Sequence, residues 1–270
     1  MKVARQREAI SSLEATNLLI GVDDTDNLVS SGTGQLVQRL VAGLQALGAG
    51  KPLGATRHQL LVDPRIPYTS HNSSACIAIQ ADLGATDRIV AFCGSFLEAE
   101  SAPGSDPGLA VVSSPVWASD GEVLRALISF GRRAKLEVLD RGLAQDTALA
   151  LGVHLSGHGG DSGGVIGALA ALGLHLSGAD GMFIWMPGIR ELRGEATYRQ
   201  LRSLAPIDAA CDPDGVEPAP GDLIELGEWV RPILRNGQAV LLVDARSSGA
   251  APDAASARWA LASRDVVKAH

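Results

Sequence analysis

The sequence predicts an α/β or α+β fold that ends in a small β-rich module. Aliphatic runs of strand length alternate along the chain with segments whose apolar residues recur every three or four positions. Apolar residues make up 46% of the 270 positions, which is enough to bury a sizeable core. The composition changes after Pro206, where prolines become frequent. We therefore expect three regions, at residues 1–100, 101–206 and 207–270.

Charge and cysteine content exclude several classes of protein. The formal net charge is −7, which argues against a broad basic surface that neutralises many phosphates. Cys76, Cys93 and Cys211 form no Cys-x-x-Cys pair, so we expect neither a zinc ribbon nor a disulfide framework. No apolar run suits a signal peptide or a membrane span. The composition thus favours a cytoplasmic protein without a membrane partner.

The first predicted element is a buried strand over residues 17–22, which leads directly into the acidic turn Asp23-Asp24-Thr25-Asp26. The carboxylates therefore lie at the C-terminal end of a strand, where α/β proteins place their ligand sites. Apolar residues then recur at helical spacing from Leu36 to Leu44. Thr33 is expected near the N-terminus of this helix, where the helix dipole favours anions.

The same alternation continues to residue 206. In the first region it predicts strands over residues 59–62 and 75–79 and a helix over 87–98. A linker rich in Pro, Gly and Ser at 101–108 opens the second region. There the pattern predicts strands over 109–113, 136–139 and 182–185, and helices around 123–128 and over 143–151, 165–172 and 196–204.

The third region, 207–270, has short apolar runs at 223–226, 233–235 and 239–243. Asn236-Gly237 separates the last two runs, and Asn-Gly between apolar runs is a strong hairpin signal. We therefore expect this module to be mainly β-structure.

The acidic turn is the main candidate for chemistry. Three carboxylates within four residues repel one another, so a cation such as Mg²⁺, which prefers hard oxygen ligands, would relieve the turn. Taken alone, a solvated Asp-rich turn is an equally good interpretation. The following Gly32-Thr33-Gly34 favours a phosphate site, because backbone N–H groups there can hold phosphate oxygens and a threonine hydroxyl can bind magnesium or accept a phosphoryl group.

A second glycine-rich turn spans residues 157–164. Gly164 begins a helix of small residues, so tight helix packing and a second anion or substrate pocket are both consistent with it. In the second case Gly164 would contact the nucleotide and Asp161 would receive a cationic group. His154 and His158 flank a predicted loop, and we interpret them as satisfied or solvated histidines in preference to a zinc pair.

A polar loop before the strand at 75–79 contains His71 and Asn72. These side chains are candidate substrate contacts, although a merely solvated loop is an equally good interpretation.

Several blocks together resemble a known family, the archaeal tRNA-isoleucine agmatidine synthetases, which use ATP to attach agmatine to a wobble cytidine. The matching blocks, in chain order, are residues 20–26, 32–34, 63–68, 106–109 and 164–173. The resemblance implies a kinase-like α/β domain and a ferredoxin-like α/β unit over about residues 18–185. It also implies that Asp23, Asp24 and Asp26 hold ATP-bound Mg²⁺, and that Thr33 matches a threonine that is phosphorylated.

The chain departs from the family at two places. Gly32-Thr33-Gly34 replaces Cys-Thr-Thr, and residues 69–73 lack the basic side chains of the family loop. We also expect the third region to be too short for both an oligonucleotide-binding fold and a zinc ribbon, which hold the tRNA in that family.

The first hypothesis is therefore an ATP- and Mg²⁺-dependent ligase or kinase-like enzyme that acts on a small-molecule acceptor. Asp24 or Asp26 would orient or deprotonate the attacking hydroxyl, and Gly32, Gly34 and Asp23 would contact the nucleotide. The alternatives are a tRNA-modifying enzyme whose partner protein grips the RNA, and a nucleotide-binding sensor without catalysis. A tRNA partner is not the favoured interpretation.

Overall fold

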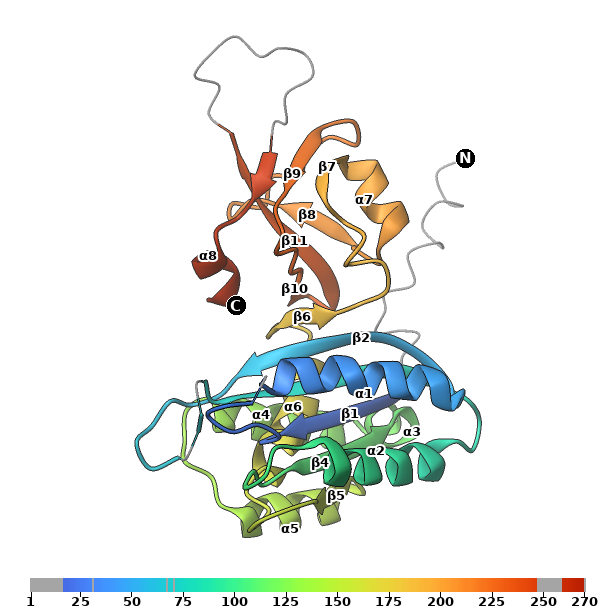
Figure 1. The fold of residues 1–270 in the computed structure, drawn as a ribbon, viewed down its shortest axis with the longest axis vertical. Coiled ribbons are helices and arrows are strands. Elements are labelled where there is room, and N and C mark those ends of the chain that lie inside the picture. The colour runs from blue at the N-terminus through green and yellow to red at the C-terminus, as the bar shows by residue number, and fades with distance from the viewer. Residues whose placement is uncertain (1–16, 31, 67, 70, 247–258, 270) are drawn as a thin grey trace.

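The computed structural model describes residues 17–30, 32–66, 68, 69, 71–246 and 259–269. The protein has a mixed α+β fold, as the sequence predicts (Figure 1). Its helices are α1 (Thr33–Leu47), α2 (Thr86–Glu100), α3 (Ser114–Ser119), α4 (Gly121–Ala134), α5 (Arg141–Leu151), α6 (Val165–Leu176), α7 (Tyr198–Leu204) and α8 (Arg264–Lys268). Its strands are β1 (Leu18–Asp23), β2 (Gly50–Gln59), β3 (Ser73–Ala81), β4 (Gly108–Ser113), β5 (His154–Gly157), β6 (Met182–Trp185), β7 (Gly194–Thr197), β8 (Ala209–Cys211), β9 (Leu223–Leu226), β10 (Ile233–Arg235), β11 (Gln238–Ala245) and β12 (Trp259–Leu261).

One antiparallel sheet dominates the N-terminal part, with strand order β5-β4-β1-β3-β2-β6. β1 lies at its centre and pairs with β3 on one side and β4 on the other. Strands from residues 1–100 and 101–206 thus hydrogen-bond to one another within a single sheet. Whether the chain divides into folding units at residues 100 and 206 stays a prediction.

Helices cover both faces of this sheet, as Figure 1 shows. The alternation of β1 explains the two layers, because Ile20 and Val22 pack with α1 and α2 while Leu19 packs with α4, α5 and α6. All three of these β1 side chains are fully buried. β1 is therefore buried on both faces, and it ends at the acidic turn.

Small residues let α6 lie unusually close to its neighbours. A Cβ atom on Gly21 of β1 would overlap the carbonyl oxygen of Ala168, and one on Gly173 of α6 would overlap the carbonyl of Leu127 in α4. Side chains at these positions would push α6 off the sheet. The Gly and Ala content of 165–173 is thus explained by packing.

The C-terminal part is mainly β-structure, and its two apolar clusters also take in Phe183 and Met182 of β6. β10 and β11 form the predicted hairpin, in which Asn236 and Gly237 both have positive φ, at 53° and 73°. Those angles suit the two-residue turn that Asn-Gly favours. β10 also pairs with β6 at Met182, and this pairing joins the C-terminal strands to the N-terminal sheet.

Two of the predicted strands are wrong. The strand expected over 59–62 lies earlier, at Gly50–Gln59, where Gly50, Pro52 and Gly54 weaken the strand pattern and the register of β2 shifts between Pro52 and Gly54. Residues 136–139 form a turn and loop, with Leu136 largely exposed. Within the described residues, no helix has the length and apolar character needed to cross a membrane.

Candidate active site

The acidic turn begins at the last residue of β1 and turns sharply away from the sheet. Asp24 has φ 51°, a left-handed conformation that Asp adopts more readily than most residues. Thr25 is buried, and its hydroxyl donates to the hydroxyl of Thr33 over 3.1 Å. The hydroxyl of Thr69 donates to Oδ2 of Asp26 over 3.2 Å. Short polar contacts therefore hold the carboxylates between the start of α1 and the loop before β3.

Thr33 is the first residue of α1, as predicted. Gly32 precedes it with φ 82°, and no side chain caps the helix. The first-turn N–H groups of an uncapped helix attract anions, and the dipole of this 15-residue helix adds to that attraction.

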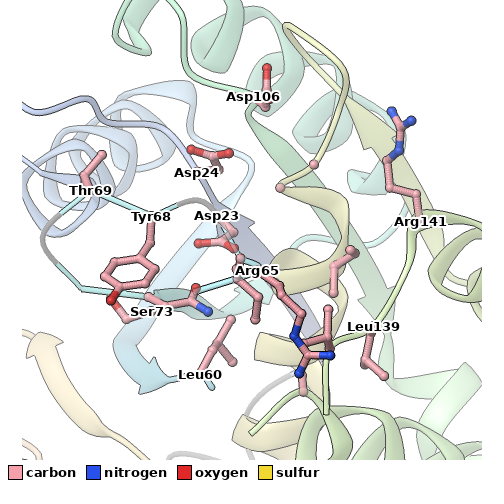
Figure 2. A pocket seen from close by; sticks show the side chains of 18 of the residues that line it. Asp23, Asp24, Leu60, Arg65, Tyr68, Thr69, Ser73, Asp106, Leu139 and Arg141 are labelled. Atoms are coloured by element: carbon pink, nitrogen blue, oxygen red, sulfur yellow. The ribbon is translucent and has the colours of Figure 1, made fainter. Parts of the chain in front are cut away.

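The three carboxylates of the acidic turn and the side chain of Thr33 line one cavity of about 380 Å³, part of which Figure 2 shows. Of the predicted site residues, the cavity is lined by Asp23, Asp24, Asp26, Thr33, His71, Asn72, Asp161 and Gly164. Gly32 and Gly34 flank Thr33 but do not line the cavity. In Figure 2, Asp23 and Asp24 lie between Tyr68 and Thr69 on one side and Arg141 on the other. Segments far apart in the sequence thus meet at the C-terminal end of β1.

The glycines of the second turn serve packing. A Cβ on Gly164 would lie 2.6 Å from the carbonyl oxygen of Asp106 and 2.9 Å from that of Asp23. The N–H of Gly164 is already used, since it donates to the carbonyl of Asp106 over 3.0 Å. One turn further into α6, a Cβ on Gly167 would overlap the carboxylate of Asp23. The start of α6 therefore forms the floor beneath the acidic turn.

Asp106 is the residue that organises this turn, and sequence reasoning assigned it no role. Its Oδ1 accepts the backbone N–H of Asp161 over 3.1 Å. It lies in a stretch read as a linker, and its only signal is the Asp-Pro-Gly sequence before β4. Asp106 adds a fourth carboxylate to those of the acidic turn in the wall of the cavity.

The crowded carboxylates disfavour their own ionisation. Burial, and then the charge of Asp24, raises the pKa of Asp23 well above its usual value. Burial, and then the charges of Asp106 and Asp26, raises the pKa of Asp24 to about 6. A cation at this place would reverse the effect, because it would stabilise the ionised carboxylates.

The donor set fits Mg²⁺ better than zinc, since every candidate ligand is a carboxylate or hydroxyl oxygen. Among the described residues, no three His, Cys, Asp or Glu side chains form a group that could hold a metal ion by themselves. Mg²⁺ commonly binds through one or two carboxylates and completes its shell with water and phosphate oxygens. A partial set of protein ligands is therefore what a magnesium–nucleotide site would present.

The loop before β3 is tied to the sheet in part by its own side chains. The amide of Asn72 donates to the carbonyl of Leu61 over 2.6 Å, and its backbone carbonyl accepts from the N–H of Leu60. Asn72 thus has a structural role in addition to lining the cavity. His71 lines the cavity and also a second, smaller hollow beside it.

Two arginines in the cavity wall were not predicted as site residues. Arg65 makes a two-point contact with Asp63, through Nε and Nη2 at 2.8 Å each. This contact holds the pKa of Asp63 at about 2. Arg141 lies at the start of α5, 4.0 Å from Asp161. Both are exposed, so sequence offers no signal beyond charge, but together they place cationic groups opposite the carboxylates.

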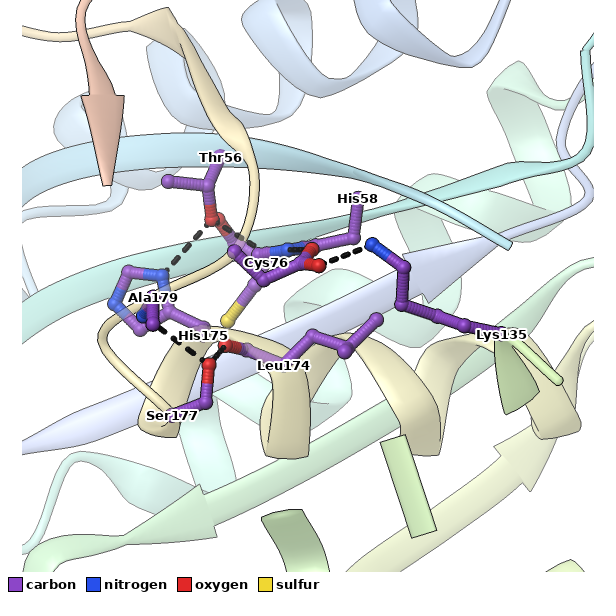
Figure 3. A network of polar contacts seen from close by, with 9 residues as sticks. Thr56, His58, Cys76, Lys135, Leu174, His175, Ser177 and Ala179 are labelled. Carbon is purple, nitrogen blue, oxygen red and sulfur yellow. Dashed lines mark hydrogen bonds and ion pairs between the residues drawn. The ribbon is translucent and has the colours of Figure 1, made fainter. Parts of the chain in front are cut away.

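Residues 137–141 line one wall of the cavity. The side chain of Lys135, just before them in the chain, joins a largely buried polar network (Figure 3). Lys135 pairs with Asp180, whose other oxygen accepts from Nδ1 of His58 over 3.0 Å. Nε2 of His58 lies 2.8 Å from the hydroxyl of Thr56, which in turn lies 2.9 Å from Nδ1 of His175. Burial would raise the pKa of Asp180, but His58 and Lys135 hold it below its usual value.

Proton positions in this network follow from its acceptors. Because Asp180 is ionised, Nδ1 of His58 donates to it, and burial lowers the pKa of His58 so that its Nε2 accepts from Thr56. The Thr56 oxygen then accepts from Nδ1 of His175, whose pKa burial lowers to about 3. Nε2 of His175 is buried and has no hydrogen-bond partner among the described residues. Both histidines are therefore neutral in the folded protein.

The other candidate residues are accounted for by ordinary contacts. His154 and His158 are linked through the hydroxyl of Ser156, at 3.0 and 2.9 Å, and His158 also contacts Glu98. These contacts agree with the interpretation of satisfied histidines. The three cysteines are all buried and form no disulfide.

Comparison with solved structures confirms the predicted resemblance at the level of the fold. The chain matches a complex of TiaS with an isoleucine tRNA and ATP, with a TM-score of 0.50 and 23% identity, over 58% of this chain and 36% of the other. A tRNA fluorescent labeling enzyme matches over the same shares with a TM-score of 0.49 and 25% identity. Apo TiaS, an agmatidine synthetase for that isoleucine tRNA, matches over 58% and 35% with a TM-score of 0.48 and 22% identity. The match thus spans only about a third of these longer proteins.

No protein-family model matches the sequence, and no curated protein is significantly similar to it.

Proposed function

We propose that this protein is an ATP-using enzyme of ligase or phosphotransfer type that activates a small-molecule acceptor in the cavity beside the acidic turn. One observation carries the proposal. The carboxylates of the acidic turn and of Asp106, the hydroxyl of Thr33 and the uncapped start of α1 converge on one cavity at the C-terminal end of β1. Carboxylates attract cations, whereas a helix N-terminus attracts anions. A magnesium–phosphate ligand contains both a cation and an anion, so it would suit both parts of the cavity.

Asp23, Asp24 and Asp26 are the residues that would hold Mg²⁺, which would neutralise phosphate charge when bound. Thr33 would contact or receive the transferred phosphoryl group, as its place at the helix start supports. Asp24 or Asp26 would orient the attacking group of the acceptor. Catalysis by these residues would rest on positioning and on charge, and little covalent chemistry would be required of the chain.

The opposite wall would hold the acceptor. It offers apolar contacts from Leu60, Val138 and Leu139, with Arg65 and Arg141 beside them. Asp161 faces this space from the second glycine-rich turn. The size of the cavity is within the range of small-molecule sites.

A tRNA acceptor is the second candidate. It is favoured by the shared fold with a protein solved in complex with an isoleucine tRNA and ATP. The net charge of −7 weighs against it, so this alternative still requires a partner protein that supplies most of the RNA contacts.

The test is incubation with γ-labelled ATP and Mg²⁺, followed by measurement of ATP binding, hydrolysis and label on the protein. Wild type should bind ATP, Asp24→Asn should lose turnover by about a hundredfold or more, and Thr33→Ala should lose any label carried by the chain. Asp82→Asn, an exposed Asp outside the cavity, is the matched control and should behave as wild type. Absence of ATP binding in the wild type would overturn the proposal, and turnover only after addition of tRNA would select the second candidate.

A further inference from the structure

Beside the cavity lies a smaller hollow of about 60 Å³, where β2, the loop before β3 and helix α8 meet. The polar side chains around it are those of Arg57, Gln59, His71 and Lys268. We propose that this hollow is a phosphate subsite, formed by Arg57 and Lys268, and that it holds a phosphate ester group of the acceptor. The second part of this proposal rests on the function proposed above.

The phosphate subsite depends mainly on Arg57. Its side chain is half-buried on β2, and its Nε donates to the hydroxyl of Ser73 over 2.8 Å. Within the described part of the chain, the side chain of Arg57 forms no ion pair with a carboxylate and no hydrogen bond besides the one to Ser73. Burial lowers its pKa, and the charge of Asp26 opposes that effect. An arginine remains protonated in proteins, so a half-buried cation here lacks a close counterion.

Lys268 brings a second cation from the far end of the chain. It is the last residue of α8, and the preceding Val267 is buried in the C-terminal apolar cluster. That packing sets the position of the lysine at the hollow. Lys268 is exposed and also forms no ion pair among the described residues, so two cations that lack an ion-pair partner border the same hollow.

The side-chain amide of the hollow is already engaged within the protein, so the two cations determine which class of ligand can bind. The amide nitrogen of Gln59 donates to the backbone carbonyls of Leu60 and Asn72, so it adds no free donor. The hollow is much smaller than the neighbouring cavity, at about 60 Å³ against about 380 Å³, and suits one oxyanion group better than a whole nucleotide. A phosphate held by the planar guanidinium of Arg57 fits both the charge and the size.

The position of the hollow points to the acceptor. His71 lines both the hollow and the main cavity, so the two spaces are neighbours across one side chain. A molecule with its phosphate in the hollow would extend its remaining part into the cavity. The phosphate ester could be the terminal group of a small acceptor or a backbone phosphodiester of a polynucleotide, since the same two cations would bind either.

The experiment measures binding of inorganic phosphate at low ionic strength and without divalent cations, conditions in which the carboxylates of the acidic turn repel phosphate from the cavity. Arg57→Gln should weaken binding about tenfold or more, and Lys268→Gln about three- to fivefold. Arg39→Gln removes an exposed arginine that pairs with Glu100 and should leave affinity unchanged. Lys268 is exposed, so its variant tests the subsite even where loss of Arg57 affects folding.

Two further ligands distinguish the sources of the phosphate. Glycerol 3-phosphate represents a small monoester, and an oligouridylate without terminal phosphates represents the diester; the ligand whose affinity falls in Arg57→Gln identifies the source. Phosphate affinity that is equal in wild type and both variants would overturn the subsite. ATP binding is measured separately, so a protein that binds phosphate through Arg57 but never binds ATP would refute the proposed function and leave the subsite standing.

Discussion

Residues 32–34 and 157–164 each place glycines at the start of a helix, and both turns border the same cavity. In the first turn a Cβ on Gly34 would meet no atom within 4 Å, whereas in the second a Cβ on Gly164 would meet backbone atoms of three residues. The first turn leaves its helix start open, and the second is closed by packing and by Asp106. A glycine-rich turn at the start of a helix can therefore be left open, as a ligand site requires, or closed by packing, and only the surrounding atoms distinguish the two.

The largest expected effect comes from a glycine-to-alanine substitution in the second turn, compared with the same substitution in the first turn. Gly164→Ala should lower the free energy of unfolding by about 3 kcal/mol or more, because backbone on both sides of the new Cβ cannot move aside cheaply. Gly34→Ala is the matched control and should be neutral or stabilising by up to about 1 kcal/mol, since its φ is ordinary and the space is open. Urea unfolding measures both. Equal losses in the two variants would remove the distinction between the turns.

Helix α6, which follows the second turn, carries the buried His175 in its last turn, and this histidine should make the stability of the protein depend on pH. Because His175 has a lowered pKa in the folded state, the unfolded chain binds a proton first as the pH falls below about 6.5, and stability is lost from there towards pH 3. From pH 7 to pH 5 the wild type should lose about 2 kcal/mol more than His175→Gln.

Urea unfolding at the two pH values gives this difference. His154→Gln, at a partly exposed edge strand, should keep most of the wild-type slope. Parallel pH profiles for wild type and His175→Gln would show that the buried network does not hold His175 neutral.

The smallest effect concerns the first turn. In a chelating buffer Asp24→Asn should raise the free energy of unfolding by about 1 kcal/mol, because it removes one of several mutually repelling charges. The exposed control Asp82→Asn should change stability little. Thermal unfolding with and without Mg²⁺ checks the claim, and it fails if added Mg²⁺ stabilises the variant as much as the wild type.

Much of the N-terminal fold could be predicted from periodicity. β1, α1, β3, α2 and β4 have buried apolar faces that repeat at strand or helix spacing, and each was predicted at nearly its observed position. β2 escaped because its buried positions include Thr56 and His58, whose burial depends on partners far away in sequence, Asp180 and His175. β5 escaped because it is a short, largely polar edge strand.

The residues of the candidate site also divide into those that local sequence patterns predict and those that depend on contacts between distant segments. The acidic turn and Thr33 could be found because they are adjacent to strong local signals, a buried strand and an amphipathic helix. Asp106, Arg65 and Arg141 could not, because each becomes a site residue only through the pairing of β1 with β4 and the packing of the loops around it. The roles assigned to the individual site residues stay predictions.

The packing of Gly167 against Asp23 has a consequence for which parts of the protein open locally. The floor of the cavity is the centre of the hydrophobic core, so amide hydrogens of α6 would exchange with solvent only when the whole domain unfolds. The described residues of the loop before β3 and residues 135–140 are held mainly by individual polar contacts, such as Thr69 to Asp26, Asn72 to Leu61 and Lys135 to Asp180, and would open at lower free energy than α6. Access to the site is thus governed by its walls, while its floor stays as rigid as the fold itself.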